Sequence, residues 1–146
     1  MSAHLQRKLV LVVDDNDAER ELYGRLLWYN GFDVAFAETG QQGISLARQK
    51  APDLVLLDMM LPDIDGLKVC DDLKQDAQTT SVPVIALSGR PERELGPAAR
   101  SVGCVTYLEK PISAVTVLHE VERLIGRAPS PGDLEVPASH TSPNPF

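Results

Sequence analysis

The sequence is poor in cysteine, in histidine and in long apolar runs, and each shortage excludes a class of protein. Its two cysteines, Cys70 and Cys104, are too few for a disulfide-stapled secreted domain, and no Cys-x-x-Cys pair or histidine cluster suggests zinc. No apolar stretch approaches the ~20 residues that a membrane-spanning helix needs. The stretch from Met1 to Lys8 is too polar and too short for a signal peptide. We therefore expect a cytoplasmic protein with no membrane partner, whose cysteines are small buried residues.

Positive charge is also scarce, because 14 lysines and arginines face 21 aspartates and glutamates, a net charge of −7. Nucleic-acid phosphates attract basic surfaces, so this balance argues against binding DNA or RNA. The 146 residues suffice for one domain with its own core, which we place at residues 1–126. Residues 127–146 are rich in proline and serine, which predicts a disordered tail and leaves no room for an output domain. Its apolar residues Leu134, Val136 and Phe146 are candidates for docking on a partner.

Strands and helices alternate five times, which predicts a three-layer, doubly wound α/β fold on a parallel sheet. Short apolar runs predict strands at about residues 8–13, 32–36, 53–58, 83–87 and 104–108. Helices are expected at about residues 16–30, 40–50, 66–75 and 112–126. The remaining helix, after Pro91, is weak because Gly96-Pro97 falls in its middle, where proline costs ~3 kcal/mol. We expect it to be short or broken and to begin properly near Pro97.

Polar side chains follow four of the predicted strands. Asp14 and Asp15 end the first strand, Asp58 the third and Ser88 the fourth, and Lys110 follows the fifth. In open α/β sheets this edge of the strands binds ligands. Three carboxylates so close together would raise one another's pKa values unless a cation neutralises them, and Mg²⁺ prefers such oxygen ligands. The sequence therefore predicts a magnesium site, to which the backbone carbonyl of Met60 can add a ligand.

The same edge has the groups for phosphoryl chemistry. Asp58 is the candidate nucleophile, because carboxylates form acyl phosphates and metal coordination supports the attack. Lys110 offers a compact positive charge, and Ser88 a hydroxyl donor, to the phosphoryl oxygens. Lys110 precedes Pro111, so a cis peptide bond is possible there. Tyr107 either moves between exposed and buried positions as Ser88 moves or is a static, half-buried residue. Singly, each of these residues is common in turns and caps, and only their combination favours the functional interpretation.

These residues resemble a known family. Asp14-Asp15, Asp58, Ser88 and Lys110-Pro111, with the loop from Met60 to Gly66, are similar to the receiver domain of two-component response regulators. Ser88 follows Asp58 by 30 residues and Lys110 follows Ser88 by 22, which matches that pattern. The resemblance covers about residues 7–126. It implies a flavodoxin-like (βα)5 fold with strand order 2-1-3-4-5.

The resemblance also implies roles for individual residues. Asp58 would accept a phosphoryl group from the phosphohistidine of a sensor histidine kinase or a histidine phosphotransfer protein. The magnesium ligands would be Asp14, Asp15, Asp58 and the Met60 carbonyl, the phosphoryl contacts Ser88 and Lys110, and the switch aromatic Tyr107. The implied function is a stand-alone regulator, a monomer or weak dimer, that switches protein–protein interactions.

Two alternatives compete with that function. The first is a receiver-like scaffold that binds partners constitutively and is never phosphorylated. It would not need all of the site residues that are present. The second is an enzyme with an aspartyl-phosphate intermediate, but such chemistry usually places a carboxylate two residues past the nucleophile, and that position is Met60. We therefore expect a protein that is not an enzyme.

Trp28 lies outside this pattern. In the predicted first helix, a step of 100° per residue places it opposite the expected buried arc of Ala18, Leu22, Tyr23, Leu26, Leu27 and Tyr29. A tryptophan that faces water either contacts a partner or second copy, or lies flat over neighbouring side-chain stems. Both interpretations stay open.

Overall fold

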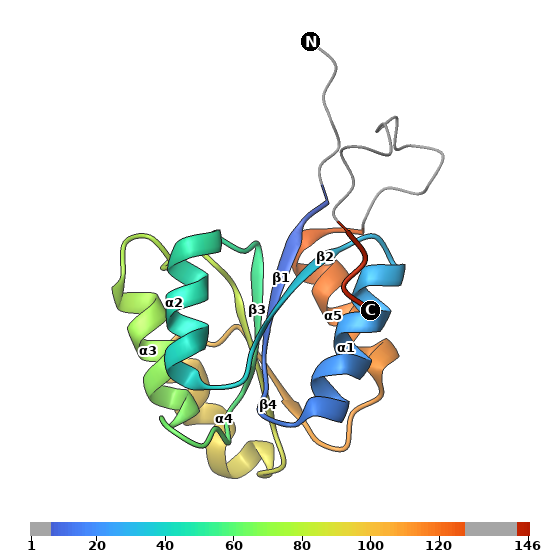
Figure 1. Ribbon diagram of the computed structural model, residues 1–146. Coiled ribbons are helices and arrows are strands. Elements are labelled where there is room, and N and C mark those ends of the chain that lie inside the picture. The colour runs from blue at the N-terminus through green and yellow to red at the C-terminus, as the bar shows by residue number, and fades with distance from the viewer. Residues whose placement is uncertain (1–6, 128–142) are drawn as a thin grey trace.

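A computed structural model describes residues 7–127 and 143–146, and strands and helices alternate through the first of these ranges (Figure 1). The strands are β1 (Leu9–Val13), β2 (Asp33–Ala37), β3 (Leu54–Asp58), β4 (Val84–Ser88) and β5 (Thr106–Glu109). The helices are α1 (Asp17–Tyr29), α2 (Gly40–Lys50), α3 (Gly66–Gln75), α4 (Glu92–Ser101) and α5 (Ala114–Ile125). The predicted alternation is confirmed.

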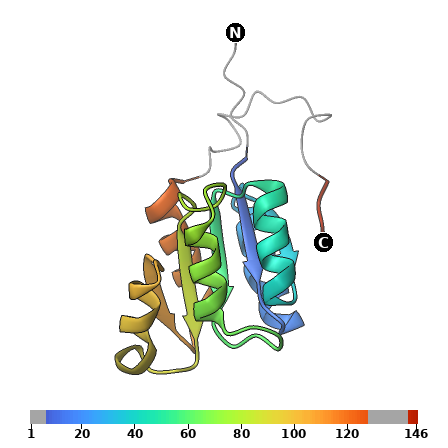
Figure 2. The same cartoon turned by 90° about the vertical axis from the view of Figure 1, so that its left-hand side faces the viewer.

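The strands form one parallel sheet in the order β2-β1-β3-β4-β5. Helices α1 and α5 cover one face, and α2, α3 and α4 cover the other (Figures 1 and 2). The direction of winding reverses at β1, whose neighbours are β2 and β3, so the edge beyond β1 and β3 is the topological switch point. The predicted three-layer, doubly wound (βα)5 fold with order 2-1-3-4-5 is confirmed.

Two apolar clusters, one on each face of the sheet, form the core. Successive residues of a strand point to opposite faces, so Leu11 and Val13 join the cluster under α2 and α3, while Val10 and Val12 join the cluster under α1 and α5. β3 and β4 are buried along their whole length. Burial on both faces explains why these strands are continuous apolar runs rather than alternating ones.

Helix α4 differs from the prediction. It runs without interruption from Glu92 to Ser101 and contains Pro97, rather than beginning near that residue. Two tertiary contacts explain why it forms. The Glu109 carboxylate accepts a hydrogen bond from the Glu92 N–H at 2.7 Å, which satisfies the start of the helix, and Ala99 is fully buried in the core.

The buried face of helix α1 differs from the predicted arc. Tyr23 and Leu27 are buried as expected, but Leu22 and Tyr29 are 53% and 65% exposed. Trp28 is half-buried, and the Arg7 guanidinium lies 4.1 Å from the centre of its ring. Arg7 also donates to the Trp28 carbonyl. The structure therefore favours the second interpretation of Trp28, a side chain packed flat against its neighbours.

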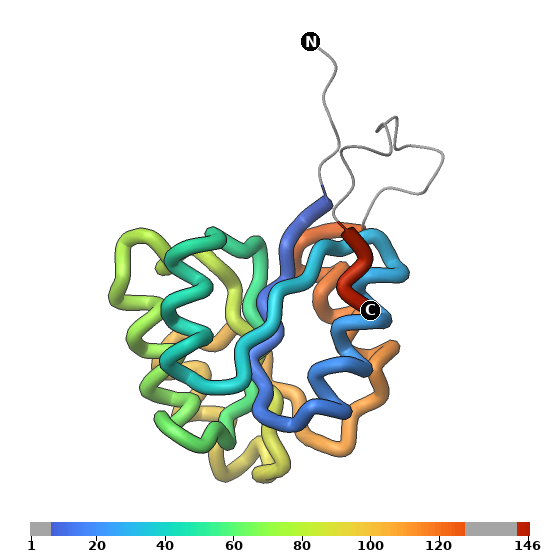
Figure 3. Tube along the Cα trace, viewed as in Figure 1, coloured from blue at the N-terminus to red at the C-terminus, as the bar shows by residue number. Residues whose placement is uncertain are grey.

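The cysteines agree with the prediction, because Cys70 and Cys104 are both buried and unbridged, with their sulfur atoms 3.0 Å apart. Within residues 7–127 and 143–146, no helix is long and apolar enough to cross a membrane. The predicted docking residues Leu134 and Val136 lie outside the described residues, as does most of the predicted tail. Phe146 is described, and its ring contacts Phe36 of β2 and Arg25 of α1. Figure 3 shows the C-terminal end of the chain beside α1.

Candidate functional site

The polar residues predicted at the strand ends meet at one edge of the sheet. Asp14 follows β1, Asp58 ends β3, Ser88 ends β4 and Lys110 follows β5. The buried polar or charged residues of the described chain are Asp14, Asp58, Thr79 and Ser88, so most of them lie at this edge. Burying polar groups is costly without partners, which points to a functional site rather than a packing surface.

Asp58 is held by two donors. Its Oδ1 accepts a hydrogen bond from the Met60 N–H at 2.8 Å, and its Oδ2 lies 3.0 Å from Lys110 Nζ. The side chain is only 6% exposed. A buried carboxylate anchored in this way is oriented for attack on an incoming group.

A backbone hydrogen bond to the end of β4 positions Lys110. Its N–H donates to the Ser88 carbonyl at 2.7 Å, and the Lys110–Pro111 peptide bond is cis, as the sequence allowed. Burial disfavours the ammonium, but its hydrogen bonds to Glu19 and Asp58 outweigh burial and raise the pKa of Lys110. The side chain is therefore a fixed positive charge at the site.

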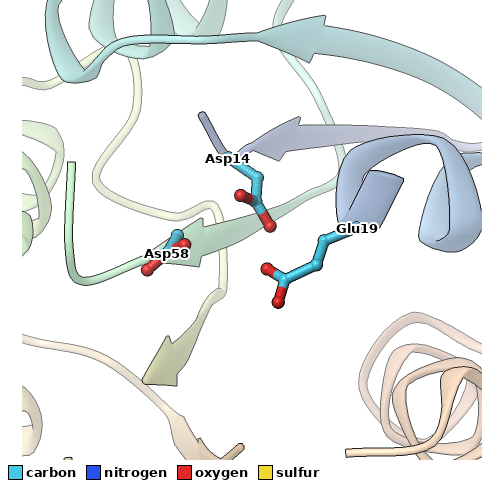
Figure 4. A group of neighbouring side chains, drawn as sticks. All are labelled: Asp14, Glu19 and Asp58. Atoms are coloured by element: carbon cyan, nitrogen blue, oxygen red, sulfur yellow. The ribbon is translucent and has the colours of Figure 1, made fainter. Parts of the chain in front are cut away.

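Glu19 is a site residue that the sequence analysis missed. Its Oε2 lies 2.7 Å from Lys110 Nζ, which is closer than Asp58. Figure 4 shows Asp14, Glu19 and Asp58 pointing toward one another, and one oxygen from each lies within 4.8 Å of the others. These three carboxylates, with Lys110, form the charged centre of the site.

A local signal for Glu19 exists in the sequence, but it predicts a different contact. Asn16 caps α1 by accepting from the Glu19 N–H at 2.9 Å, so Asn-x-x-Glu has the form of a capping box. In that motif the glutamate turns back to the N–H of the capping residue. Here the Asn16 N–H instead donates to Asp14 Oδ1 at 2.9 Å, which leaves Glu19 to reach Lys110.

Asp14 has the least favourable surroundings of the three acids. Burial raises its pKa; the Asn16 N–H opposes this, and the Glu19 carboxyl and the charge of Asp58 raise it further, to about 7. Asp14 Oδ2 is buried and has no hydrogen-bond donor among the described residues. An unpartnered buried oxygen beside two more carboxylates fits a hard divalent cation such as Mg²⁺, which takes oxygen ligands.

The other predicted magnesium ligands are less enclosed. Asp15 is exposed and is not one of the three grouped carboxylates. Met60 is 60% exposed, and its N–H faces Asp58. The assignment of Asp15 and the Met60 carbonyl as ligands stays a prediction.

Ser88 and Tyr107 are linked through one residue. The fully buried Ser88 accepts the Arg90 N–H on its Oγ at 3.0 Å, and the Tyr107 hydroxyl donates to the Arg90 carbonyl at 2.7 Å. Tyr107 is 5% exposed, so the structure holds it in the buried position. A movement of the Ser88–Arg90 turn would therefore be felt directly at Tyr107.

Known proteins are similar to this chain in sequence and in fold. Residues 10–122 match the response regulator receiver domain family. The polar-differentiation response regulator DivK of Brucella ovis is 32% identical over 121 residues, which cover 83% of this chain and 98% of DivK.

Two solved structures are also similar. A candidate response regulator from Chloroflexus aurantiacus is 26% identical with a TM-score of 0.78, over 84% of this chain and 100% of that one. Chemotaxis response regulator CheY4 of Vibrio cholerae, 24% identical, has the same fold with a TM-score of 0.77, over 82% of this chain and 99% of that one. With the charged centre at the carboxyl edge of a 2-1-3-4-5 sheet, these matches show that the chain belongs to the response regulator receiver family.

Proposed function

We propose that this protein is a phosphorylation-switched response regulator that accepts a phosphoryl group on Asp58. The observation that carries the proposal is the buried Asp58 carboxylate, 3.0 Å from Lys110 and grouped with Asp14 and Glu19 at the switch point of the sheet. The donor is a phosphohistidine on a sensor histidine kinase or a histidine phosphotransfer protein. The readout is a change in binding to another protein.

In the transfer step, an oxygen of Asp58 attacks the phosphorus, a P–O bond forms, and the P–N bond to the donor imidazole breaks. The imidazole leaves with the electron pair and takes up a proton. Asp14 and Asp58, with Asp15 and the Met60 carbonyl as further candidate ligands, would hold Mg²⁺, which would offset the charge of the carboxylates and the phosphoryl group. Lys110 supplies the positive charge next to Asp58 Oδ2.

The switch is proposed to follow from Ser88. Its hydroxyl hydrogen is available to donate to a phosphoryl oxygen, which would pull the turn containing Arg90 toward Asp58. The Tyr107 hydroxyl would then either lose its hydrogen bond to the Arg90 carbonyl or move together with that carbonyl. Because Tyr107 lies on β5 beside α4, the change would be transmitted to that side of the molecule.

Proteins of this family act in signalling, and nothing at the site favours an additional enzymatic activity. The residue two positions past Asp58 is Met60, whose side chain cannot serve as a general acid or base. We propose that loss of the phosphoryl group is slow self-hydrolysis. We place the protein in the cytoplasm with its donor.

The test is intact mass after incubation with acetyl phosphate and Mg²⁺. We expect the mass of one added phosphate in the wild-type chain, and none in Asp58→Asn or in the presence of EDTA. A second receiver that is known to accept phosphate serves as the positive control. If it gains phosphate while the folded wild-type chain does not, the result would instead support the constitutive scaffold.

A further inference from the structure

Residues 143–146 lie on the surface between α1 and β2, far along the chain from the elements they touch (Figures 1 and 3). The Phe146 ring meets Phe36 of β2 edge-on, with ring centres 6.0 Å apart at 70°. The Arg25 guanidinium of α1 lies 4.7 Å from the centre of the same ring. Asn144 Nδ2 lies 3.4 Å from the Tyr29 hydroxyl, so the segment touches both elements.

The segment is folded to present its ring. The Phe146 N–H donates to Asn144 Oδ1 at 2.9 Å, which closes a turn of the kind that asparagine side chains form. Pro145 fixes a backbone dihedral angle between these two residues. The ring is therefore directed at α1 and β2 by contacts within the segment as well as by the surface.

The surface is shaped for an aromatic ring at Gly24. This residue lies in the interior of α1, where glycine is less favourable than alanine. A Cβ added here would lie 2.5 Å from Phe36 Cε1 and 3.0 Å from Phe146 Cζ. The glycine thus lets the Phe36 ring lie close to the helix backbone, where it forms the floor on which Phe146 rests.

Charged side chains surround this contact. Phe36, Pro145 and Phe146 are the apolar walls of a neighbouring hollow of about 440 Å³, whose other lining residues are Asp17, Arg20, Glu21, Arg25 and Glu38. Glu21 holds Arg25 at 2.8 Å and so supports the guanidinium over the ring. On this surface α1 and β2 contribute one apolar side chain, Phe36, and one cation over the ring, Arg25. This suits a single aromatic side chain on a short segment and does not suit the long apolar face of an amphipathic helix.

We propose that Gly24, Arg25 and Phe36 form a pocket, the α1–β2 pocket, that binds a Pro-Phe segment, and that residues 143–146 are its occupant within the same chain. The inference goes beyond the proposed phosphorylation and does not depend on it. Because the ligand and the pocket share one chain, docking is unimolecular, and the attached segment acts at a high effective concentration. A free peptide must therefore compete with the attached segment.

The test uses the full ¹⁵N-labelled chain and its Phe146→Ala variant, followed by amide NMR. Removal of the ring is expected to shift the Gly24, Arg25 and Phe36 signals. An acetylated and amidated Pro-Asn-Pro-Phe peptide should return these signals of Phe146→Ala toward their wild-type positions. The wild-type chain should need at least roughly tenfold more peptide for any response. Phe146→Tyr, which keeps the ring, should resemble wild type.

Two controls make the result specific. The peptide Pro-Asn-Pro-Ala should leave all signals unchanged, and Val115→Ala, at an exposed position on α5, should leave the pocket signals as in wild type. The proposal is overturned if Phe146→Ala leaves the three amides unmoved, or if the peptide does not affect that variant. Pocket signals of the wild-type chain that change with protein concentration would also overturn it, because they would assign the occupant to a second copy.

Discussion

At the scale of single residues, Lys110 is shared between two acids. Its Nζ lies 2.7 Å from Glu19 and 3.0 Å from Asp58, so Glu19 competes with the phosphoacceptor for the same positive charge. Lys110 also holds the pKa of Glu19 below its usual value, against the effect of burial. Glu19 is therefore ionised near pH 7 and adds a negative charge where a phosphoryl group must arrive.

Glu19→Gln is expected to speed phosphorylation. The variant keeps a hydrogen-bonding side chain but removes one charge. Two unit charges ~4 Å apart repel by about 1 kcal/mol even at the dielectric constant of water, which sets a factor of at least roughly 5 in rate. The measurement is the initial rate of phosphate gain from acetyl phosphate at saturating Mg²⁺. Glu122→Gln, the same charge change on α5, is the matched control and should behave as wild type. A slower or unchanged rate in Glu19→Gln would contradict this role.

Asp14 leads to a prediction about pH. Its pKa in the folded protein, about 7, is above its ordinary value of 3.8, so the folded chain binds this proton more tightly than the unfolded chain. The corresponding stability is complete below the unfolded pKa and is lost as the pH rises through the folded one.

In EDTA, we expect the unfolding free energy of wild type to fall relative to Asp14→Asn between pH 5 and pH 7. The limiting slope is about 1.4 kcal/mol per pH unit, and the difference should level off at higher pH. Urea denaturation at a series of pH values measures it. A difference between the two proteins that does not change with pH would show that Asp14 ionises normally.

At the scale of elements, α4 shows where local sequence signals mislead. Gly96-Pro97 predicted a break, because Pro97 cannot donate to the carbonyl of Arg93. The helix forms because its first N–H is satisfied by Glu109 from β5 and its inner side packs on the core through Ala99. Neither contact can be predicted from the residues of α4 alone, because Glu109 lies on β5 and the packing of Ala99 depends on the rest of the core.

Pro97→Ala is therefore expected to stabilise the protein, by about 1–3 kcal/mol, because it restores one helical hydrogen bond without disturbing the exposed face. Chemical denaturation measures the change, and slower amide hydrogen exchange in α4 should accompany it. Ala98→Gly, the neighbouring exposed position, should destabilise by about 1 kcal/mol. If the Pro97→Ala protein were less stable than wild type, Pro97 would be stabilising α4 rather than only being tolerated in it.

At the scale of the whole molecule, the sheet was the most predictable feature. Apolar runs such as Leu54–Asp58 are recognisable because both faces of each inner strand are buried, and their polar ends had to meet at one edge. Asp14, Asp58, Ser88 and Lys110 were found in this way. Glu19 was not, because its direction depends on how α1 leaves β1 and on which donor Asn16 uses.

Contacts between distant segments were beyond prediction for a related reason. Arg7 lies over Trp28, and Phe146 rests on Phe36, although nothing in the local sequence pairs these residues. Both contacts cover α1, whose inner face was also misjudged at Leu22 and Tyr29. The pattern of apolar residues specifies which helices pack on the sheet. The contacts on the outer faces of these helices depend on segments that lie far away in the sequence.

Chemical trapping can show whether Asp58 carries the phosphoryl group. Borohydride reduces an aspartyl phosphate to homoserine, so peptide mass mapping after acetyl phosphate and Mg²⁺ treatment identifies the modified residue. We expect homoserine at position 58, and none when EDTA is present during phosphorylation. Homoserine at position 14 or 15, or at no position in a chain that has gained phosphate, would show that Asp58 is not the phosphoacceptor.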